Sequence, residues 1–237
     1  MSVYREGVRT PESRHSCCHA PAETMHPVLR LWEDFLTDRG VLSLPALPRM
    51  LYVVRGAAMV GARPIAQGEA WHGQDAVTVR ASEAGATVWR WDLSTGTPGA
   101  WRNGPGVISR ERIAARLETL PEGDLLWRGD SVAFPPGGIA YLHRHQGPGI
   151  RCLIEGELRV DTAGESHSYQ VGDSWYESGP EPVFARAGNR PTRFVRVMIL
   201  PRALIGKSSI AYVNEDDKAK PKSQQYRVFV DAPLARP

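Results

Sequence analysis

His143 and His145 are separated by a single residue in the segment 137–145, which reads Gly-Gly-Ile-Ala-Tyr-Leu-His-Arg-His. Side chains on a β-strand alternate between its two faces, so two histidines spaced in this way project from the same face. A neutral imidazole nitrogen is the commonest protein ligand for a divalent metal. The pair therefore predicts that one strand supplies two ligands to a metal ion.

The composition sets the class of protein in which such a site must be built. The 237 residues include 23 glycines and 19 prolines, which favours many short strands over long helices. The net charge of +3, without a basic stripe interleaved with aromatic residues, argues against a nucleic-acid partner. No apolar run is long enough to cross a membrane, so no membrane partner is expected. The three cysteines do not make a disulfide framework, and a cytoplasmic location is expected.

The N-terminal segment 1–24 is polar and interrupted by proline, and it is interpreted as flexible. It contains a cluster of possible metal ligands, formed by His15, Cys17, Cys18 and His19. We interpret this cluster as part of a mobile terminus rather than as a metal site.

Local patterns predict a chain made mostly of strands. Apolar spacing predicts two short helices, over 28–36 and over 109–120. The segments 94–106 and 214–223 are predicted loops. Strands are predicted over 50–54, 76–79 and 87–91, over several runs between 125 and 200, and over 226–230.

The chain also contains an internal repeat. Residues 52–60 align with 152–160 through a shared glycine, and residues 68–71 align with 172–175. Each copy is predicted to run strand, glycine turn, strand, acidic turn, strand. Antiparallel hairpins repeated in this way close into a small barrel or a double-sheet jelly roll. Two copies predict two barrels in one chain.

The second copy resembles the cupin superfamily, and the whole chain resembles a two-barrel member, a bicupin. The first cupin motif, Gly-x5-His-x-His-x3-Glu-x6-Gly, is matched by Gly137, His143, His145 and Gly156, but its glutamate falls on Gly149. The second motif is matched at its glycine, Gly172, whereas its histidine falls on Val183. Two of the four metal ligands that the resemblance implies are therefore absent.

The resemblance implies an all-β fold of two cupin-type double-stranded β-helix (jelly-roll) barrels with a few short helices. It implies a degenerate N-terminal barrel over 25–106 and a C-terminal barrel with a tail over 107–237. In the first barrel the ligand positions fall on Ser43, Pro45, Arg49 and Val79. That barrel is therefore expected to hold no metal and to supply interface and stability.

A pair of imidazoles alone makes a weak metal site, so a third ligand is needed. Glu177 is the candidate, because it lies two residues beyond Trp175 on the same strand face, and in the cupin fold that strand runs along the barrel wall next to the histidine pair. It would complete a set of two histidines and one carboxylate for Fe, Mn, Ni or Zn. The alternative is that Glu177 lies at the barrel rim, solvated or paired with an arginine.

Three further side chains are candidate substrate contacts. Arg151 shares strand parity with the histidines, and its anionic partner is either Glu177 or a substrate carboxylate. Tyr141 shares that parity too and is interpreted as a hydrogen-bond donor or as wall packing. Trp175 is core packing or a substrate contact. By contrast, Arg186 and Arg196 are expected on outer faces or rims.

The leading hypothesis is a metal-dependent enzyme of the dioxygenase, lyase or isomerase type, acting on a small organic acid or ketone in the second barrel. One alternative is a small-molecule-binding or sensory cupin with a decayed metal site. Another is an isomerase or epimerase in which a histidine acts as the base without a metal. The resemblance also implies a homodimer. No P-loop, dinucleotide fingerprint or nucleophile elbow is present, which excludes kinases, nucleotide hydrolases and serine esterases.

Overall fold

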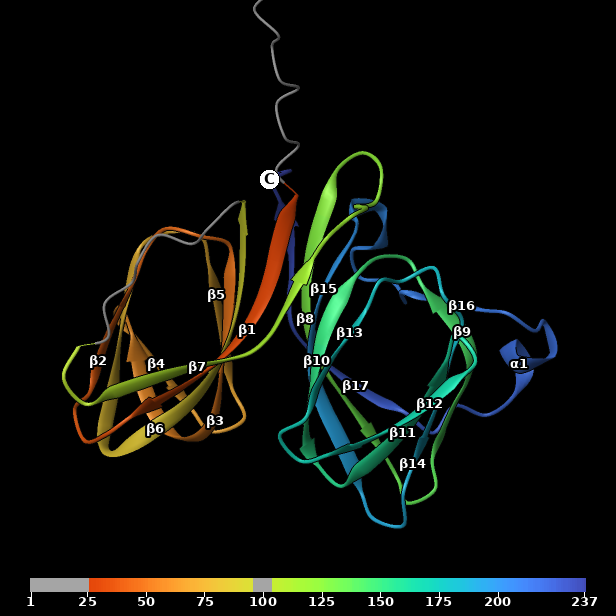
Figure 1. The fold of residues 1–237 in the computed structure, drawn as a ribbon, viewed down its shortest axis with the longest axis horizontal. Helices are drawn as coiled ribbons and strands as arrows, with labels where there is room; N and C mark the ends of the chain where they lie inside the picture. The colour runs from red at the N-terminus through yellow and green to blue at the C-terminus, as the bar shows by residue number, and fades with distance from the viewer. Residues whose placement is uncertain (1–25, 96–103) are drawn as a thin grey trace, which may run out of the picture.

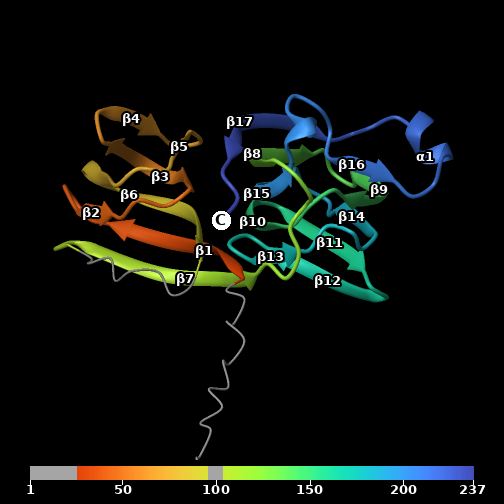
Figure 2. The ribbon, with the colours of Figure 1, turned by 90° about the horizontal axis from the view of Figure 1, so that it is seen from above.

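The computed structural model describes residues 26–95 and 104–237, and the N-terminal cluster of histidines and cysteines lies outside them. Two barrels of antiparallel strands lie side by side (Figures 1 and 2). The first contains β1 (Pro27–Leu36), β2 (Val41–Leu44), β3 (Arg49–Val60), β4 (Arg63–Ala66), β5 (Ala70–Gly73), β6 (Val77–Thr95) and β7 (Val107–Arg116). Together they form a seven-stranded sheet that curves round on itself (Figure 1).

The second barrel consists of two facing sheets of five strands each, ordered β13-β10-β15-β8-β17 and β12-β11-β14-β9-β16. Its early strands are β8 (Leu125–Phe134), β9 (Ile139–His145), β10 (Gly149–Glu155), β11 (Glu157–Thr162), β12 (Glu165–Gln170) and β13 (Ser174–Glu177). Its later strands are β14 (Val183–Ala187), β15 (Thr192–Pro201), β16 (Ile210–Tyr212) and β17 (Gln225–Leu234). Two single-turn helices, η1 (Arg202–Leu204) and α1 (Asp216–Ala219), lie in its connections.

The strand pairing confirms the internal repeat. Tyr52 of β3 pairs with Ala70 of β5, and the corresponding Cys152 of β10 pairs with Ser174 of β13. The likeness continues beyond the aligned residues, because β1 pairs with β6 and β7 as β8 pairs with β15 and β17. The two barrels therefore share one topology.

Both predicted helices are wrong, since 28–36 lies in β1 and 109–116 lies in β7. β1 is covered on both faces: Leu29 and Leu31 pack toward the second barrel, whereas Asp34 and Leu36 are buried on the other side. A strand buried on both faces loses its apolar-polar alternation, and its apolar positions then fit a helix equally well. The pairing of β7 with β1 also extends the first barrel to Arg116, beyond the predicted boundary at 106.

Apolar side chains gather in three main places: inside the first barrel, inside the second, and between the two. The cluster between the barrels includes Trp91 and Trp127, and the Trp91 indole N–H donates to the carbonyl of Ile150 at 3.2 Å. The sheets approach so closely that a Cβ built on Gly129 would lie 2.1 Å from the sulfur of Met50. The barrels are thus held together by a continuous apolar contact.

The first barrel also encloses an ion cluster of four buried residues. Arg90 Nε and Nη2 donate to the Asp34 carboxylate at 2.7 and 3.0 Å, and Arg90 Nη1 also hydrogen-bonds Asp92. Arg49 Nε donates to Asp92 at 2.9 Å. Two guanidinium groups thus face two carboxylates. Arg49 falls on one of the family's ligand positions, so a balanced ion cluster occupies the place that the resemblance assigns to a metal.

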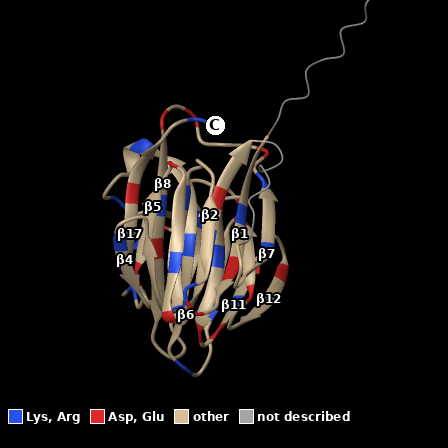
Figure 3. Cartoon of the chain, turned by 90° about the vertical axis from the view of Figure 1, so that its left-hand side faces the viewer, with Lys and Arg blue, Asp and Glu red and all other residues tan. Residues whose placement is uncertain are grey.

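Charged residues of both signs are interspersed over the first barrel (Figure 3). In the described part of the chain, no helix is long and apolar enough to span a membrane.

We expect Asp34→Ala to lower the free energy of unfolding by about 3–5 kcal/mol, because it removes a carboxylate from a buried, charged guanidinium. The matched control is Asp38→Ala, since Asp38 is exposed and lies 3.7 Å from the exposed Arg39. That change should cost less than about 0.5 kcal/mol. Urea unfolding followed by tryptophan fluorescence gives both values, and equal costs would contradict the role assigned to the cluster.

Candidate functional site

Strand β9 delivers both histidines into the second barrel, where both are buried. The strand carries a bulge: Val183 of β14 pairs with His143 and Ala185 pairs with Ala140, so β9 has one extra residue between the two pairs. A bulge shifts the alternation of side chains. Ala140, His143 and His145 consequently all line one cavity.

The same bulge overturns the expected position of Tyr141, which does not line that cavity. Its ring instead lies beneath the ammonium groups of Lys220 and Lys222, at 5.0 and 5.5 Å from the ring centre. Its carbonyl still serves the site, because it lies 2.7 Å from His143 Nδ1. Tyr141 would face the same side as the two histidines only if β9 had no bulge.

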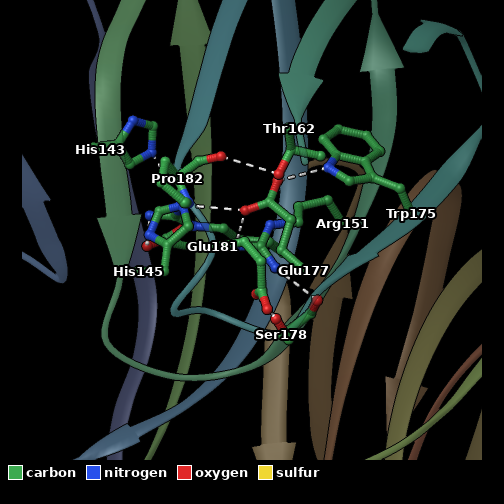
Figure 4. Close-up of polar contacts among 12 residues, drawn as sticks. His143, His145, Arg151, Thr162, Trp175, Glu177, Ser178, Glu181 and Pro182 are labelled. Atoms are coloured by element: carbon green, nitrogen blue, oxygen red, sulfur yellow. Dashed lines mark hydrogen bonds and ion pairs between the residues drawn. The ribbon is translucent and has the colours of Figure 1, made fainter. Parts of the chain in front are cut away.

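Four side chains form a continuous polar chain across the cavity (Figure 4). His143 Nε2 lies 3.2 Å from His145 Nε2, and His145 Nε2 lies 3.3 Å from Glu177 Oε2. Glu177 Oε2 in turn lies 2.8 Å from Arg151 Nη2. Glu177 Oε2 and Arg151 Nη2 thus form an ion pair, but neither atom has a hydrogen-bond partner. The structure thus brings Glu177 to the predicted histidine pair.

The protonation of the two imidazoles follows from their surroundings. A carbonyl accepts only, so His143 Nδ1 must carry the proton toward Tyr141 and Nε2 presents its lone pair to the cavity. Burial lowers the pKa of His143, and burial together with the charges of Arg151 and Arg196 holds the pKa of His145 well below its usual value. Both rings are therefore neutral at physiological pH, which is the state that coordinates metals.

Arg151 is almost completely buried, at 1% exposure, and burial lowers its pKa to about 10. It therefore remains a cation at neutral pH. Its Nη1 donates to the carbonyl of Gly149 at 2.6 Å. A Cβ on Gly149 would lie 2.4 Å from the carbonyl oxygen of Val197, so the glutamate of the cupin motif cannot be accommodated there without moving the backbone.

The expectation that Arg196 lies on an outer face or a rim is wrong. Arg196 lies inside the barrel at 3% exposure, and it donates to Asp130 from Nε at 2.7 Å and from Nη2 at 3.1 Å. Burial alone would lower the pKa of Arg196, but Asp130 raises it above the usual value. The sequence did contain a signal for this position. Arg196 lies between Val195 and Val197 on β15, and both valines pack between the barrels, so the Arg196 side chain must face the barrel interior.

Trp175 fixes the carboxylate from the other side. Its indole N–H donates to Glu177 Oε1 at 2.8 Å, and its ring stacks on Tyr169 at 4.4 Å. It lines the cavity, so a contact with substrate stays a prediction. Arg186 is exposed, as expected. Cys152 faces the apolar layer between the barrels, and burial raises the pKa of its thiol, which keeps it protonated.

The cavity around the histidines has a volume of about 20 Å³. That is room for one water molecule or one ion. Val183 and Trp175 lie among its walls, together with the aromatic rings of Phe134 and Phe194. Val183, where the resemblance expects the fourth metal ligand, does lie opposite His143.

The donor atoms fit a metal ion in type and spacing. Two nitrogens that each bind one metal at about 2.1 Å, at a right angle, lie about 3 Å apart. The two Nε2 atoms lie 3.2 Å apart, and the buried Glu177 Oε2 lacks a hydrogen bond. Against this, no group of three or more His, Cys, Asp or Glu side chains in the described residues is arranged so that it could hold a metal ion as it stands. His145 Nε2 lies within 3.3 Å of both other donor atoms, whereas Arg151 competes for the Glu177 carboxylate.

No protein-family model matches the chain, and no curated protein sequence matches it. Solved structures do match. The DEL162-163 mutant of Bacillus subtilis oxalate decarboxylase has a TM-score of 0.54 at 16% identity, with 81% of this chain and 73% of that chain covered.

A second Bacillus subtilis oxalate decarboxylase structure has a TM-score of 0.58 at 14% identity, with 81% and 73% covered. A third oxalate decarboxylase structure has a TM-score of 0.56 at 15% identity, with 84% and 74% covered. At such identities the likeness establishes the fold, which is that of cupin jelly-roll barrels. The homodimer and the cytoplasmic location stay predictions.

We expect Gly149→Ala to destabilise the protein by about 3 kcal/mol, because the added methyl group meets the backbone of β15. Gly164→Ala is the control: Gly164 has a φ of +81° with open space around its Cβ position, so only backbone strain of about 1 kcal/mol is expected. Urea unfolding measures both. A Gly149→Ala variant as stable as the wild type would show that β10 and β15 can separate to admit a side chain.

Proposed function

We propose that the second barrel is the active site of a metal-dependent enzyme acting on a small organic acid or ketone. His143, His145 and Glu177 would hold the divalent ion, which is Fe, Mn, Ni or Zn. One observation carries the proposal: two neutral imidazole nitrogens and a carboxylate oxygen follow one another at 3.2 and 3.3 Å inside a buried cavity. Among the dioxygenase, lyase and isomerase types, the structural neighbours favour the lyase, since they are oxalate decarboxylases, and one of them is described by its Mn(II) centres.

The ion, when bound, would act as a Lewis acid that polarises an oxygen of the substrate. The chain's own residues prepare the site. The Tyr141 carbonyl keeps the proton of His143 on Nδ1, so that Nε2 is free to bind. The Trp175 N–H and the Arg151 cation hold the two oxygens of Glu177 in place. The aromatic and aliphatic walls exclude bulk water, which strengthens every electrostatic interaction inside.

A second candidate function is a metal-free barrel that binds a small molecule without converting it. The contact between Arg151 and Glu177 favours this candidate, because it already neutralises the carboxylate that the ion would use. In that case His145 Nε2 carries a proton toward Glu177 and the polar chain is complete without a metal.

Metal analysis separates the two candidates. We expect protein purified without an affinity tag to contain close to one Fe, Mn, Ni or Zn ion per chain, as measured by inductively coupled plasma mass spectrometry. His145→Ala should lose the metal, because His145 contacts both other donors. Glu177→Gln keeps the shape but removes the charge, and it should weaken metal affinity by about 10–100-fold.

The matched control is His167→Ala, which removes a half-exposed histidine of β12. It should leave the metal content unchanged. Folded wild-type protein that contains no metal, and gains none on dialysis against Mn²⁺ or Zn²⁺, would refute the enzyme proposal and favour the binding function.

A further inference from the structure

The cavity around the histidines is too small for an organic substrate. Its volume of about 20 Å³ admits one water or ion. A second compartment of about 290 Å³ lies in the same barrel, near the lower limit of pockets that hold small organic ligands. This second space, which we call the mouth compartment, shares three lining residues with the histidine cavity, so it can hold the body of a substrate whose reacting end points at the histidines. It is lined by Arg128, Asp130, Arg196, Gly206, Lys207, Ser208, Ser209, Ile210, Tyr226, Val228 and Asp231.

The two spaces are consecutive sections of one barrel interior. Alternate residues of β8 face inward: Phe134 and Val132 line the histidine cavity, whereas Asp130 and Arg128 line the mouth compartment. Arg196, Ile210 and Tyr226 line both. The Arg196 guanidinium lies 5.9 Å from the centre of the Tyr226 ring. Arg196 and Tyr226 thus form the partition between the two sections.

The wall of the mouth compartment is held in place by hydrogen bonds. Arg128 donates to the carbonyls of Lys207 and Leu204 at 2.7 and 2.6 Å, and it pairs with Asp231 at 2.8 Å. The backbone N–H of Gly206 donates to Asp231 at 2.6 Å. The segment 204–209 leads into β16, and β16 pairs with β9, the strand that carries the two histidines. The compartment is therefore formed before any ligand arrives, which lowers the entropic cost of binding.

Among the residues that the structure describes, one cation on this wall has no ion-pair partner. Arg128 is paired with Asp231, and Arg196 is paired with Asp130. Lys207 forms no ion pair with any described residue, although it lines the compartment. The same compartment is lined by the apolar surfaces of Val228 and Tyr226, which are 54% and 47% exposed. An anion with a flat or branched apolar body matches this surface.

We infer that the mouth compartment binds the body of an organic monocarboxylate, with the carboxylate on Lys207 and the apolar part against Tyr226 and Val228. The opposite end of the molecule reaches past Arg196 toward His143 and His145. This inference names the substrate class of the proposed enzyme, and it rests on that proposal only in assigning the reacting end to the histidines.

Benzoate is the probe, because it combines a flat apolar body with a carboxylate, and benzamide is the neutral match of the same shape. We expect titration calorimetry to show that benzoate binds the wild type more tightly than benzamide does. Lys207→Met should weaken benzoate binding by at least about fivefold and leave benzamide unchanged. Val228→Trp, which fills the compartment from an exposed position, should abolish binding of both.

The matched control is Lys218→Met, since Lys218 is exposed and pairs with Glu215 on α1. It should bind benzoate as the wild type does. Equal binding of benzoate and benzamide, no binding of either, or an unchanged affinity in Lys207→Met would overturn the inference.

Repeating the titration on EDTA-treated protein keeps this inference separate from the metal proposal. Benzoate binding that persists without metal and depends on Lys207 supports the mouth compartment, even if the protein proves to hold no metal. Binding that disappears with the metal places the carboxylate on the ion instead; it would overturn this inference and leave the proposed enzyme standing.

Discussion

The apolar contact between the two barrels is the constraint on which the candidate site depends. Strands β8, β10 and β15 each present alternate residues to that contact, among them Trp127, Ile150 and Val197. The residues between them must face the interior of the second barrel, and in this way Asp130, Arg151 and Arg196 are buried. Burying such charged groups is costly, and the apolar area buried on the opposite face of the same strands offsets that cost. The first barrel therefore contributes to the site without touching it.

The shared topology shows how one frame produces two different interiors. The pairing of Tyr52 with Trp89 corresponds to that of Cys152 with Val195, so Arg90 and Arg196 occupy equivalent positions. In the first barrel Arg90 belongs to an ion cluster in which carboxylates face both arginines, and the rest of the interior is packed with hydrocarbon. In the second barrel Arg196 has one carboxylate, and two neutral histidines lie beyond it. The interior of the first barrel is filled and charge-balanced, whereas the interior of the second barrel contains imidazole lone pairs and a small cavity.

Much of this arrangement could be predicted from the sequence, and the failures have physical causes. The repeat and the glycine turns predicted strand-built barrels, the His-x-His spacing predicted the pairing of His143 with His145, and the resemblance to cupins implied that Glu177 lies near them. The sequence did not reveal the bulge in β9, which depends on how β14 pairs with it and which turns Tyr141 outward. The sequence also did not indicate that β1 is a strand, because a strand covered on both faces by tertiary contacts shows no alternation of apolar and polar residues. Arg196 was misplaced because an arginine was assumed to be exposed, although a buried carboxylate at Asp130 compensates its charge.

Charge balance bears on how the proposed site would take both a metal and an acid. The histidine cavity sets the cations of Arg151 and Arg196 against the carboxylates of Glu177 and Asp130, so it is close to neutral before any ion enters. A divalent ion would therefore gain little from the net field and would depend on the two imidazole lone pairs and on a share of Glu177. For the same reason an acid gains little by placing its carboxylate in the cavity, where Arg151 already has a partner. Among the described cations that line the two cavities, Lys207 forms no ion pair, and it lies in the compartment that has the volume for an organic molecule. Charge and size thus assign the ion and the body of the acid to different sections of one barrel, with Arg196 and Tyr226 between them.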